Sequence, residues 1–234
     1  MARHLPPEEM LLEYAAGTLP EPLALLVASH LTLAPESRRD VQAFEAVGGA
    51  LLEELEPVEM SDDALDSLLA RLDKEDADES EAGTRGSGAA LVSAPPKTRP
   101  MVQTESGIIL PAPLRAYIGG DADCVPWLER TGNVAEYDVL PGYPDFRTRL
   151  LRIRAGAKIP SHTHEGREFT LVLDGSFSDE EGHFERGDVE VADGDVTHMP
   201  VAGSERDCIC LAVTDAPLRM TGPFGRLLNY FVDM

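Results

Sequence analysis

Residues 156–175 read GAKIPSHTHEGREFTLVLDG, which places two histidines and a glutamate between flanking glycines. His162 and His164 are two residues apart, so on a β-strand both side chains would project from the same face. Glu168 opens the apolar run FTLVLD, and a fourth candidate, His198, lies downstream in GDVTHMP. Three imidazoles and one carboxylate suit Zn²⁺, and also Fe²⁺, Mn²⁺ or Ni²⁺. The stretch therefore predicts a metal site within a β-rich fold.

Further short strands are predicted around this stretch. The segments NVAEYDVL, TRLLRIRA, REFTLVLD, GDVEVAD and DCICLAVT are β-rich, and most are separated by Gly, Pro or Asp. Their spacing favours a small antiparallel barrel or jelly roll. Cys208 and Cys210 would share one face of a strand, either as a redox pair or as two small buried apolar side chains. His183 is expected in an exposed hairpin and is not counted as a ligand.

The N-terminal part of the chain carries helical patterns instead. PPEEMLLEYAAG has prolines suited to a first helical turn and Gly17 at its end. PEPLALLVASHLTL and ESRRDVQAFEAVGGALLEEL predict a second and a third helix. A fourth, DDALDSLLARLDK, follows Ser61 as a possible N-cap, and one of its faces carries Leu65, Leu68, Leu69 and Leu72. That face is expected either to join a core or to dock onto a partner.

Length, composition and charge limit the possible domain organisation and binding partners of the chain. Its 234 residues allow one large domain or two small ones. The charged, Gly-, Ser- and Pro-rich residues 74–100 predict a flexible linker between domains at 1–73 and 101–234. The net charge of −22 argues against direct binding of nucleic acid or anionic lipid. It suits a basic protein partner, or it serves solubility alone. No apolar run reaches transmembrane length, no signal pattern is present, and the three cysteines form no disulfide framework, so a cytoplasmic protein is expected.

The spacing of the metal candidates resembles the first motif of the cupin superfamily. That motif runs glycine, five residues, His-x-His, three or four residues, glutamate, six residues, glycine, and it is complete from Gly156 to Gly175. The second motif keeps Gly187 and a histidine, but Asp193 and Asp195 stand where the family has proline and glycine. The resemblance implies a jelly-roll barrel that binds one divalent metal, zinc foremost, through His162, His164, Glu168 and His198.

The helical half is similar to the zinc-binding anti-sigma domain, and in particular to the ChrR type, in which this domain precedes a cupin. The likeness runs from YAAGTL through ASHL to the GG helix, and it resumes at DCICLAVTDAPLR. It implies an α+β multidomain protein with a four-helix anti-sigma domain and an all-β cupin domain. Such proteins are not enzymes: they bind a sigma factor of the extracytoplasmic-function group. They release it on a stress signal, singlet oxygen or organic peroxide in the best-known members, and the cupin is needed for release.

One motif departs from that family. Its zinc site uses an N-terminal histidine and the pattern His, three residues, Cys, two residues, Cys. His4 and His30 match, whereas Ala34 and Ser37 occupy the cysteine positions. Alanine has no donor atom and a serine hydroxyl is a poor zinc ligand, so no second zinc is expected and His30 should bond to its neighbours.

Two other functions remain compatible with the sequence. A site of three histidines and one glutamate with an open coordination position could activate oxygen or water in a metalloenzyme such as a dioxygenase, with the helices as an adaptor. Alternatively, the chain could be a scaffold that lost sigma binding together with the two cysteines. The walls of the predicted site are mostly apolar and offer no clear additional acid–base pair, which favours the anti-sigma function.

Overall fold

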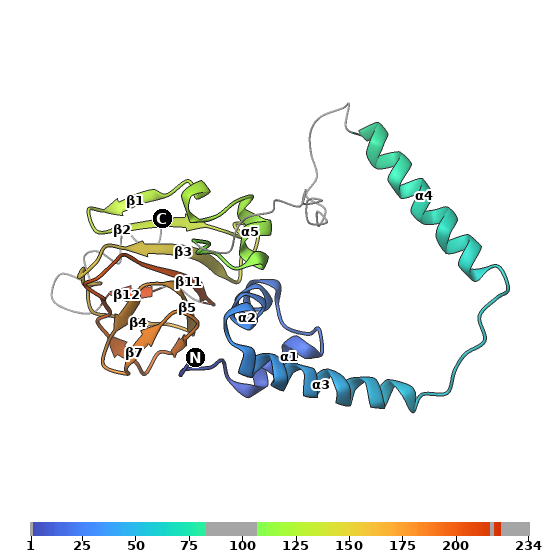
Figure 1. Cartoon of the computed structure of the whole chain (residues 1–234), viewed down its shortest axis with the longest axis horizontal. Coiled ribbons are helices and arrows are strands. Elements are labelled where there is room, and N and C mark those ends of the chain that lie inside the picture. Colours follow the sequence, from blue (N-terminus) through green and yellow to red (C-terminus); the bar gives the residue numbers. More distant parts are fainter. Residues whose placement is uncertain (1, 83–106, 216–217, 221–234) are drawn as a thin grey trace. The chain divides into compact units, whose positions relative to one another are not determined.

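The computed structural model of the protein describes residues 2–82, 107–215 and 218–220 (Figure 1). The chain divides into two compact units. One contains residues 1–48 together with 98–234, and the other contains residues 49–97. Within residues 2–82 the chain forms α1 (Glu8–Ala15), α2 (Glu21–Leu33), α3 (Pro35–Glu53) and α4 (Ala64–Ala82). The four helices that the sequence predicts are therefore present.

The fourth helix is longer than its pattern suggests. It continues to Ala82, so residues 74–82, which the sequence assigns to the linker, are helical. The rest of the predicted linker, residues 83–100, lies outside the described residues. The boundaries at 73 and 100 stay a prediction.

Antiparallel strands form the second half of the chain. A six-stranded sheet has the order β1-β2-β3-β11-β5-β8. Its members are β1 (Leu128–Thr131), β2 (Val134–Asp138), β3 (Arg147–Ile153), β11 (Cys208–Thr214), β5 (Glu168–Asp174) and β8 (Val189–Ala192). The five segments predicted as strands correspond to β2, β3, β5, β8 and β11.

Two three-stranded sheets complete the β half. One pairs β10 (Val201–Ala202), β6 (Ser176–Ser178) and β7 (His183–Glu185). The other pairs β12 (Leu218–Met220), β4 (His162–His164) and β9 (Thr197–His198). A helix that the sequence did not suggest, α5 (Ala112–Ile118), and a short 3₁₀ turn at Ala122–Cys124 precede β1.

Both faces of the central strands are covered. Every residue of β11 is buried, and so is every residue of β5 except the last. Alternate side chains belong to two separate clusters, because neighbouring residues of a strand face opposite ways. Leu171 and Leu211 join the larger cluster, whereas Val172 and Cys210 join a smaller one with Phe177. The smaller cluster occupies the interior between the sheets, and the larger lies on the outer face of the six-stranded sheet.

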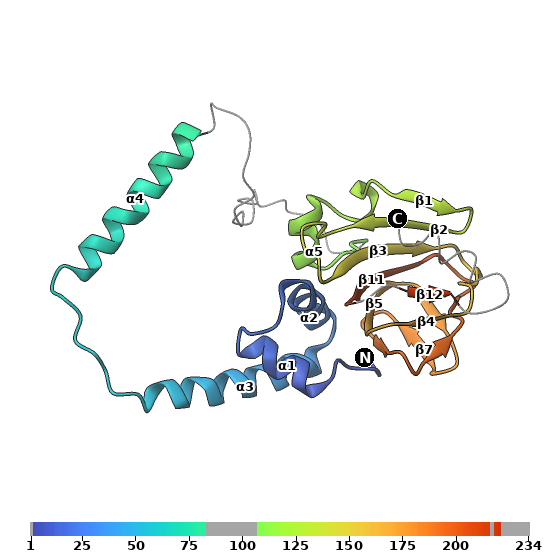
Figure 2. The same cartoon turned by 180° about the vertical axis from the view of Figure 1, so that it is seen from behind.

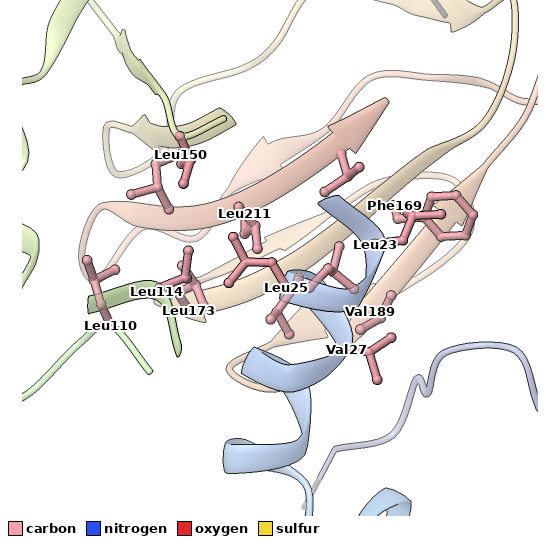
Figure 3. Close-up of a cluster of buried hydrophobic side chains, with 14 of the residues drawn as sticks. Leu23, Leu25, Val27, Leu110, Leu114, Leu150, Phe169, Leu173, Val189 and Leu211 are labelled. Carbon is pink, nitrogen blue, oxygen red and sulfur yellow. The ribbon is translucent and has the colours of Figure 1, made fainter. Parts of the chain in front are cut away.

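Helix α2 covers that outer face. Figure 3 shows Leu23, Leu25 and Val27 near apolar side chains of the sheet, of α5 and of the segment just before α5. These are Leu110, Leu114, Leu150, Phe169, Leu173, Val189 and Leu211. Figures 1 and 2 both place α2 next to α5. At the start of α2, the hydroxyls of Tyr117 and Tyr143 both donate to the carboxylate of Glu21. The N-terminal helices and the sheet therefore share one hydrophobic core, and the metal-binding candidates lie on the other side of that sheet.

Candidate metal centre

Strands β4 and β9 bring two of the predicted ligands together. His162 and His198 are direct cross-strand partners. Their Nε2 atoms are 3.1 Å apart, and both side chains are buried. Two donors bound to one ion at about 2.1 Å would be separated by roughly 3.0 Å at a right angle and about 3.4 Å at a tetrahedral angle. The observed separation falls within that range, so both rings fit one metal ion.

The other ring nitrogen of each histidine is held by oxygen. Nδ1 of His162 donates to the carbonyl of Pro160 at 2.9 Å. Nδ1 of His198 lies 2.8 Å from Oδ2 of Asp179 and 3.2 Å from Oε1 of Glu190. Such bonds select the tautomer of a ligating imidazole and direct its remaining lone pair toward the metal. Both rings are thus oriented with Nε2 toward a common point.

The acidic partners of His198 were not anticipated from the sequence. Burial lowers the pKa of His198, but hydrogen bonds to Glu190 and Asp179 outweigh it and raise the pKa to about 9. Burial raises the pKa of Glu190 to about 8. Burial would also raise the pKa of Asp179, but hydrogen bonds from Glu190 and His198 lower it on balance. The surroundings therefore favour a positive charge on or beside His198, and either a proton or a metal ion at Nε2 can supply it.

The remaining predicted ligands are His164 and Glu168, which are four residues apart in the sequence. Glu168 is the first residue of β5 and is buried, with its Oε1 at 3.4 Å from the hydroxyl of Thr170. Alternation along β5 places it on the same face as Val172, which belongs to the interior cluster. His164 ends β4, but its side chain lies outside the described residues. The four-ligand set as a whole stays a prediction.

Asp179, Glu190 and His198 also form a compact group by themselves. Their potential ligand atoms lie within 4.8 Å of one another, and among the described residues this is the group of His, Cys, Asp and Glu that could hold a metal ion. The weak signal for Glu190 in the sequence is its position as the charged residue of the apolar strand VEVA. Asp179 follows β6 in a turn rich in acidic residues, and nothing in that pattern separates it from its neighbours.

The altered second motif still forms a turn. Oδ1 of Asp193 accepts a hydrogen bond from the amide of Asp195 at 3.0 Å, and its carbonyl accepts one from the amide of Val196 at 3.1 Å. A side-chain bond of this kind fixes a turn without proline. The chain therefore returns into β9, and His198 keeps its place despite the substitutions.

The predicted remnant of a second zinc site contains hydrogen bonds instead. His30 is fully buried; its Nδ1 donates to the carbonyl of Gly187 at 2.9 Å, and its Nε2 accepts from the hydroxyl of Ser37 at 2.8 Å. Burial lowers the pKa of His30, which favours the neutral ring that these two bonds require. The ring of His4 instead lies 4.5 Å from that of Phe184, and no described contact joins it to His30.

The two strand cysteines are enclosed by apolar side chains. Cys208 and Cys210 are buried on β11, with their sulfur atoms 3.4 Å apart. The hydrogen bond to Cys208 and burial raise the pKa of the Cys210 thiol. A thiol with a raised pKa is a poor nucleophile, which fits two small buried side chains better than a reactive pair. His183 is exposed on β7, where it bonds to Ser178, as expected for a hairpin residue.

Comparisons with known proteins show which proteins this chain resembles. Residues 119–217 match the ChrR Cupin-like domain family. The chain is 39% identical over 229 residues to the anti-sigma-E factor ChrR of Cereibacter sphaeroides, covering 98% of this chain and 97% of that protein. It also resembles a chain in the crystal structure of Rhodobacter sphaeroides SigE in complex with the anti-sigma ChrR, with 35% identity, a TM-score of 0.71, and coverage of 92% and 100% of the two chains.

These matches extend over the helices and the barrel together, and they confirm the expected combination of anti-sigma helices with a cupin domain. No helix among the described residues is long and apolar enough to span a membrane. With more than a third of its residues identical over nearly its whole length, the chain belongs to the ChrR family of anti-sigma factors.

Proposed function

We propose that this protein binds a sigma factor of the extracytoplasmic-function group, keeps it from RNA polymerase, and releases it on a stress signal sensed through the cupin domain. The identity of 39% along nearly the full length of an anti-sigma-E factor carries this proposal. The match to a ChrR chain crystallised with SigE supports the same kind of partner. The protein acts in this way as a cytoplasmic binding protein rather than as an enzyme.

Exposed apolar side chains on the helices supply a surface for that partner. On α4, Leu65, Leu68, Leu69 and Leu72 are each about half exposed or more. Among residues 49–74, whose side chains are described, none is buried. A leucine row at helical spacing without a core of its own is typical of a helix that docks into another protein. Leu51, at the end of α3 and in the same unit as α4, is 61% exposed as well.

The test uses the full chain and the extracytoplasmic-function sigma factors of its own organism. We expect one of them to co-elute with the protein on gel filtration, and the double substitution Leu68→Asp with Leu72→Asp to abolish co-elution. A matched control is Leu128→Asp, which charges a leucine that is 53% exposed on β1. If none of these sigma factors binds, or if the control disrupts binding as much as the α4 variant, the proposal is wrong.

We infer further that the barrel binds one divalent metal ion, most readily zinc, through the four predicted ligands. The orientation of the two Nε2 atoms and the attraction of positive charge to His198 support this. When bound, the metal would supply a Lewis-acidic centre. The residues of the chain hold and orient that centre, whereas in the helices the hydroxyl of Ser37 bonds to Nε2 of His30.

Metal analysis of the purified protein should give about one equivalent per chain. We expect His162→Ala to reduce it to near zero, because the Nε2 atom facing His198 is lost, whereas His30→Ala should leave it unchanged. Chelation should lower the melting temperature of the protein, since the metal binds only the folded barrel. A second stoichiometric zinc, or retention of zinc by His162→Ala, would contradict the assignment.

A further inference from the structure

Residues 187–190, which lead into strand β8 (Val189–Ala192), contact both the N-terminal segment and the candidate metal centre. The carbonyl of Gly187 accepts from His30 of α2. Oδ1 of Asp188 accepts from the amides of Arg3 and His4 at 2.5 and 3.1 Å. At the other end of this run, Glu190 lies against the metal-ligand candidate His198. One short segment of backbone thus contacts both the N-terminal helical part and the candidate metal ligand His198.

Residues 187–189 form a buried binding site, or seat, for the N-terminal segment. Asp188 is 2% exposed, and its second oxygen accepts from the amide of Glu185 at 2.8 Å, which closes the turn between β7 and β8. The amide of Val189 donates to the carbonyl of His4 at 2.9 Å. Residues 3 and 4 thereby continue the hydrogen bonding at the edge of β8. Gly187 adopts a φ of 96°, a left-handed conformation that favours glycine, and its carbonyl bonds to His30.

The fourth residue, Glu190, fixes the metal ligand. Its carboxyl group and that of Asp179 hold Nδ1 of His198, so the ring can rotate only if these bonds break. Side chains at this depth cannot shift without displacing close-packed neighbours. A metal ion that pulls Nε2 of His198 toward its preferred position therefore also moves or stiffens Glu190 and the strand that carries it.

We propose that strand β8 couples metal binding at His198 to the seating of the N-terminal segment and α2, with Glu190 as the positioning residue that links them. This coupling rests on the proposed metal site and deepens the proposed function. A change at the cupin metal would loosen Arg3, His4 and His30 from residues 187–189, and so alter how the N-terminal segment and α2 are held. Loss of the metal should weaken the binding of the N-terminal segment, and loss of that binding should weaken metal affinity, since linkage between two sites is reciprocal.

Zinc affinity tests the coupling from one side. Asp188→Asn removes a carboxylate that holds the N-terminal segment but is not itself among the predicted ligands. We expect the zinc dissociation constant of this variant, measured by competition with a fluorescent chelator, to be at least about fivefold higher than that of the wild type. The matched control Glu185→Gln changes an exposed carboxylate in the same turn and should bind zinc like the wild type. In the double variant with Glu190→Gln, the two effects should be less than multiplicative, because the same path is already broken.

Hydrogen exchange tests the reverse effect, that of zinc on the N-terminal segment. The measurement on the wild type does not depend on a variant that could misfold. Zinc should slow exchange at the amides of Arg3, His4 and Val189 at least about fivefold. In Glu190→Gln at saturating zinc this slowing should be lost. In Asp179→Asn at saturating zinc it should persist, because Asp179 holds the same histidine from outside β8.

The outcomes separate this proposal from the proposed function. If the wild type binds zinc but exchange at these amides does not change, or if Asp188→Asn binds zinc as tightly as Glu185→Gln, the coupling is wrong and the metal site stands. If the wild type binds no zinc, the metal site and the coupling both fail. Sigma binding is measured separately by co-elution, so either result leaves the anti-sigma assignment to its own test.

Discussion

Ser37 shows how one residue changes what stabilises the helical half of this protein. Its hydroxyl donates to Nε2 of His30 inside a fully buried site, while Ala34, also fully buried, fills the other cysteine position of the related zinc motif. A hydrogen bond between α2 and α3 therefore lies at the position of that motif, where the sequence predicted no zinc. The bond at Nδ1 extends this link to Gly187 in the barrel.

Ser37→Ala should destabilise the protein by about 1–3 kcal/mol, because it leaves a buried acceptor on His30 without its donor. Denaturant unfolding of the full chain, followed by circular dichroism, measures the change. Thr32→Ala is a suitable control: that hydroxyl is on the exposed side of α2 and donates to the carbonyl of Ser29. The control should cost less than about 0.5 kcal/mol. Equal effects of the two substitutions would mean that the buried bond contributes nothing specific.

The residues of the candidate metal centre differ in whether the spacing of the sequence alone could identify them. His162, Glu168 and His198 follow a spacing that could be recognised in the sequence. Asp179 and Glu190 could not be predicted, because their contacts depend on how three separate strands and a turn come together. Ser37 lies between these cases, since the missing thiolate was visible but its bond to His30 required the fold.

Helix α2 is the element that joins the two halves of the structure. Leu25, Leu26 and Val27 follow one another in its sequence, and all three are buried. A helix with apolar residues on all sides is typically covered on all sides. Here α1 and α3 contribute to the same cluster as the sheet and α5. That pattern was visible in LALLVASHL, but it could not reveal that a β-sheet supplies part of the cover.

Leu26→Ala should lower the free energy of unfolding by about 2–5 kcal/mol, the usual cost of a cavity in a close-packed core. Because the cluster around Leu26 includes residues of both the helices and the sheet, both should lose stability together. Thermal unfolding monitored at a helix-sensitive wavelength and by Trp127 fluorescence should shift equally. Leu12→Ala, at a leucine that is 49% exposed on α1, should have little effect. A shift confined to the helical signal would show that the two halves are stabilised independently.

Elements with strong local patterns were thus predicted well, whereas a short helix without one was not. The central strands β3, β5 and β11 each have seven residues, and all three were anticipated. Helix α5 has only seven residues, follows Pro111 and ends at Gly119, and such a short helix depends on its burial against α2 rather than on its own pattern. Its absence from the prediction reflects that tertiary origin.

On the scale of the whole molecule, a shared core changes what the predicted linker can do. The sequence suggested helical and cupin domains that move independently about residues 74–100. In the unit formed by residues 1–48 and 98–234, however, α2 packs on the sheet, and the N-terminal segment bonds to Asp188 and to Val189 of β8. Cutting the chain between these two parts should therefore not release one from the other.

A protease site inserted after Gly88 tests this arrangement. Cleavage should give two polypeptides that still elute together on gel filtration and separate only in denaturant, because burial of the α2 leucines and the bonds to Asp188 hold them without a covalent link. The same cleavage in a Leu26→Asp variant should let the pieces separate, since an unpaired buried charge disrupts the contact. Separation of the wild-type pieces in native buffer would show that the halves are independent. Sigma release would then have to pass through the linker rather than through strand β8.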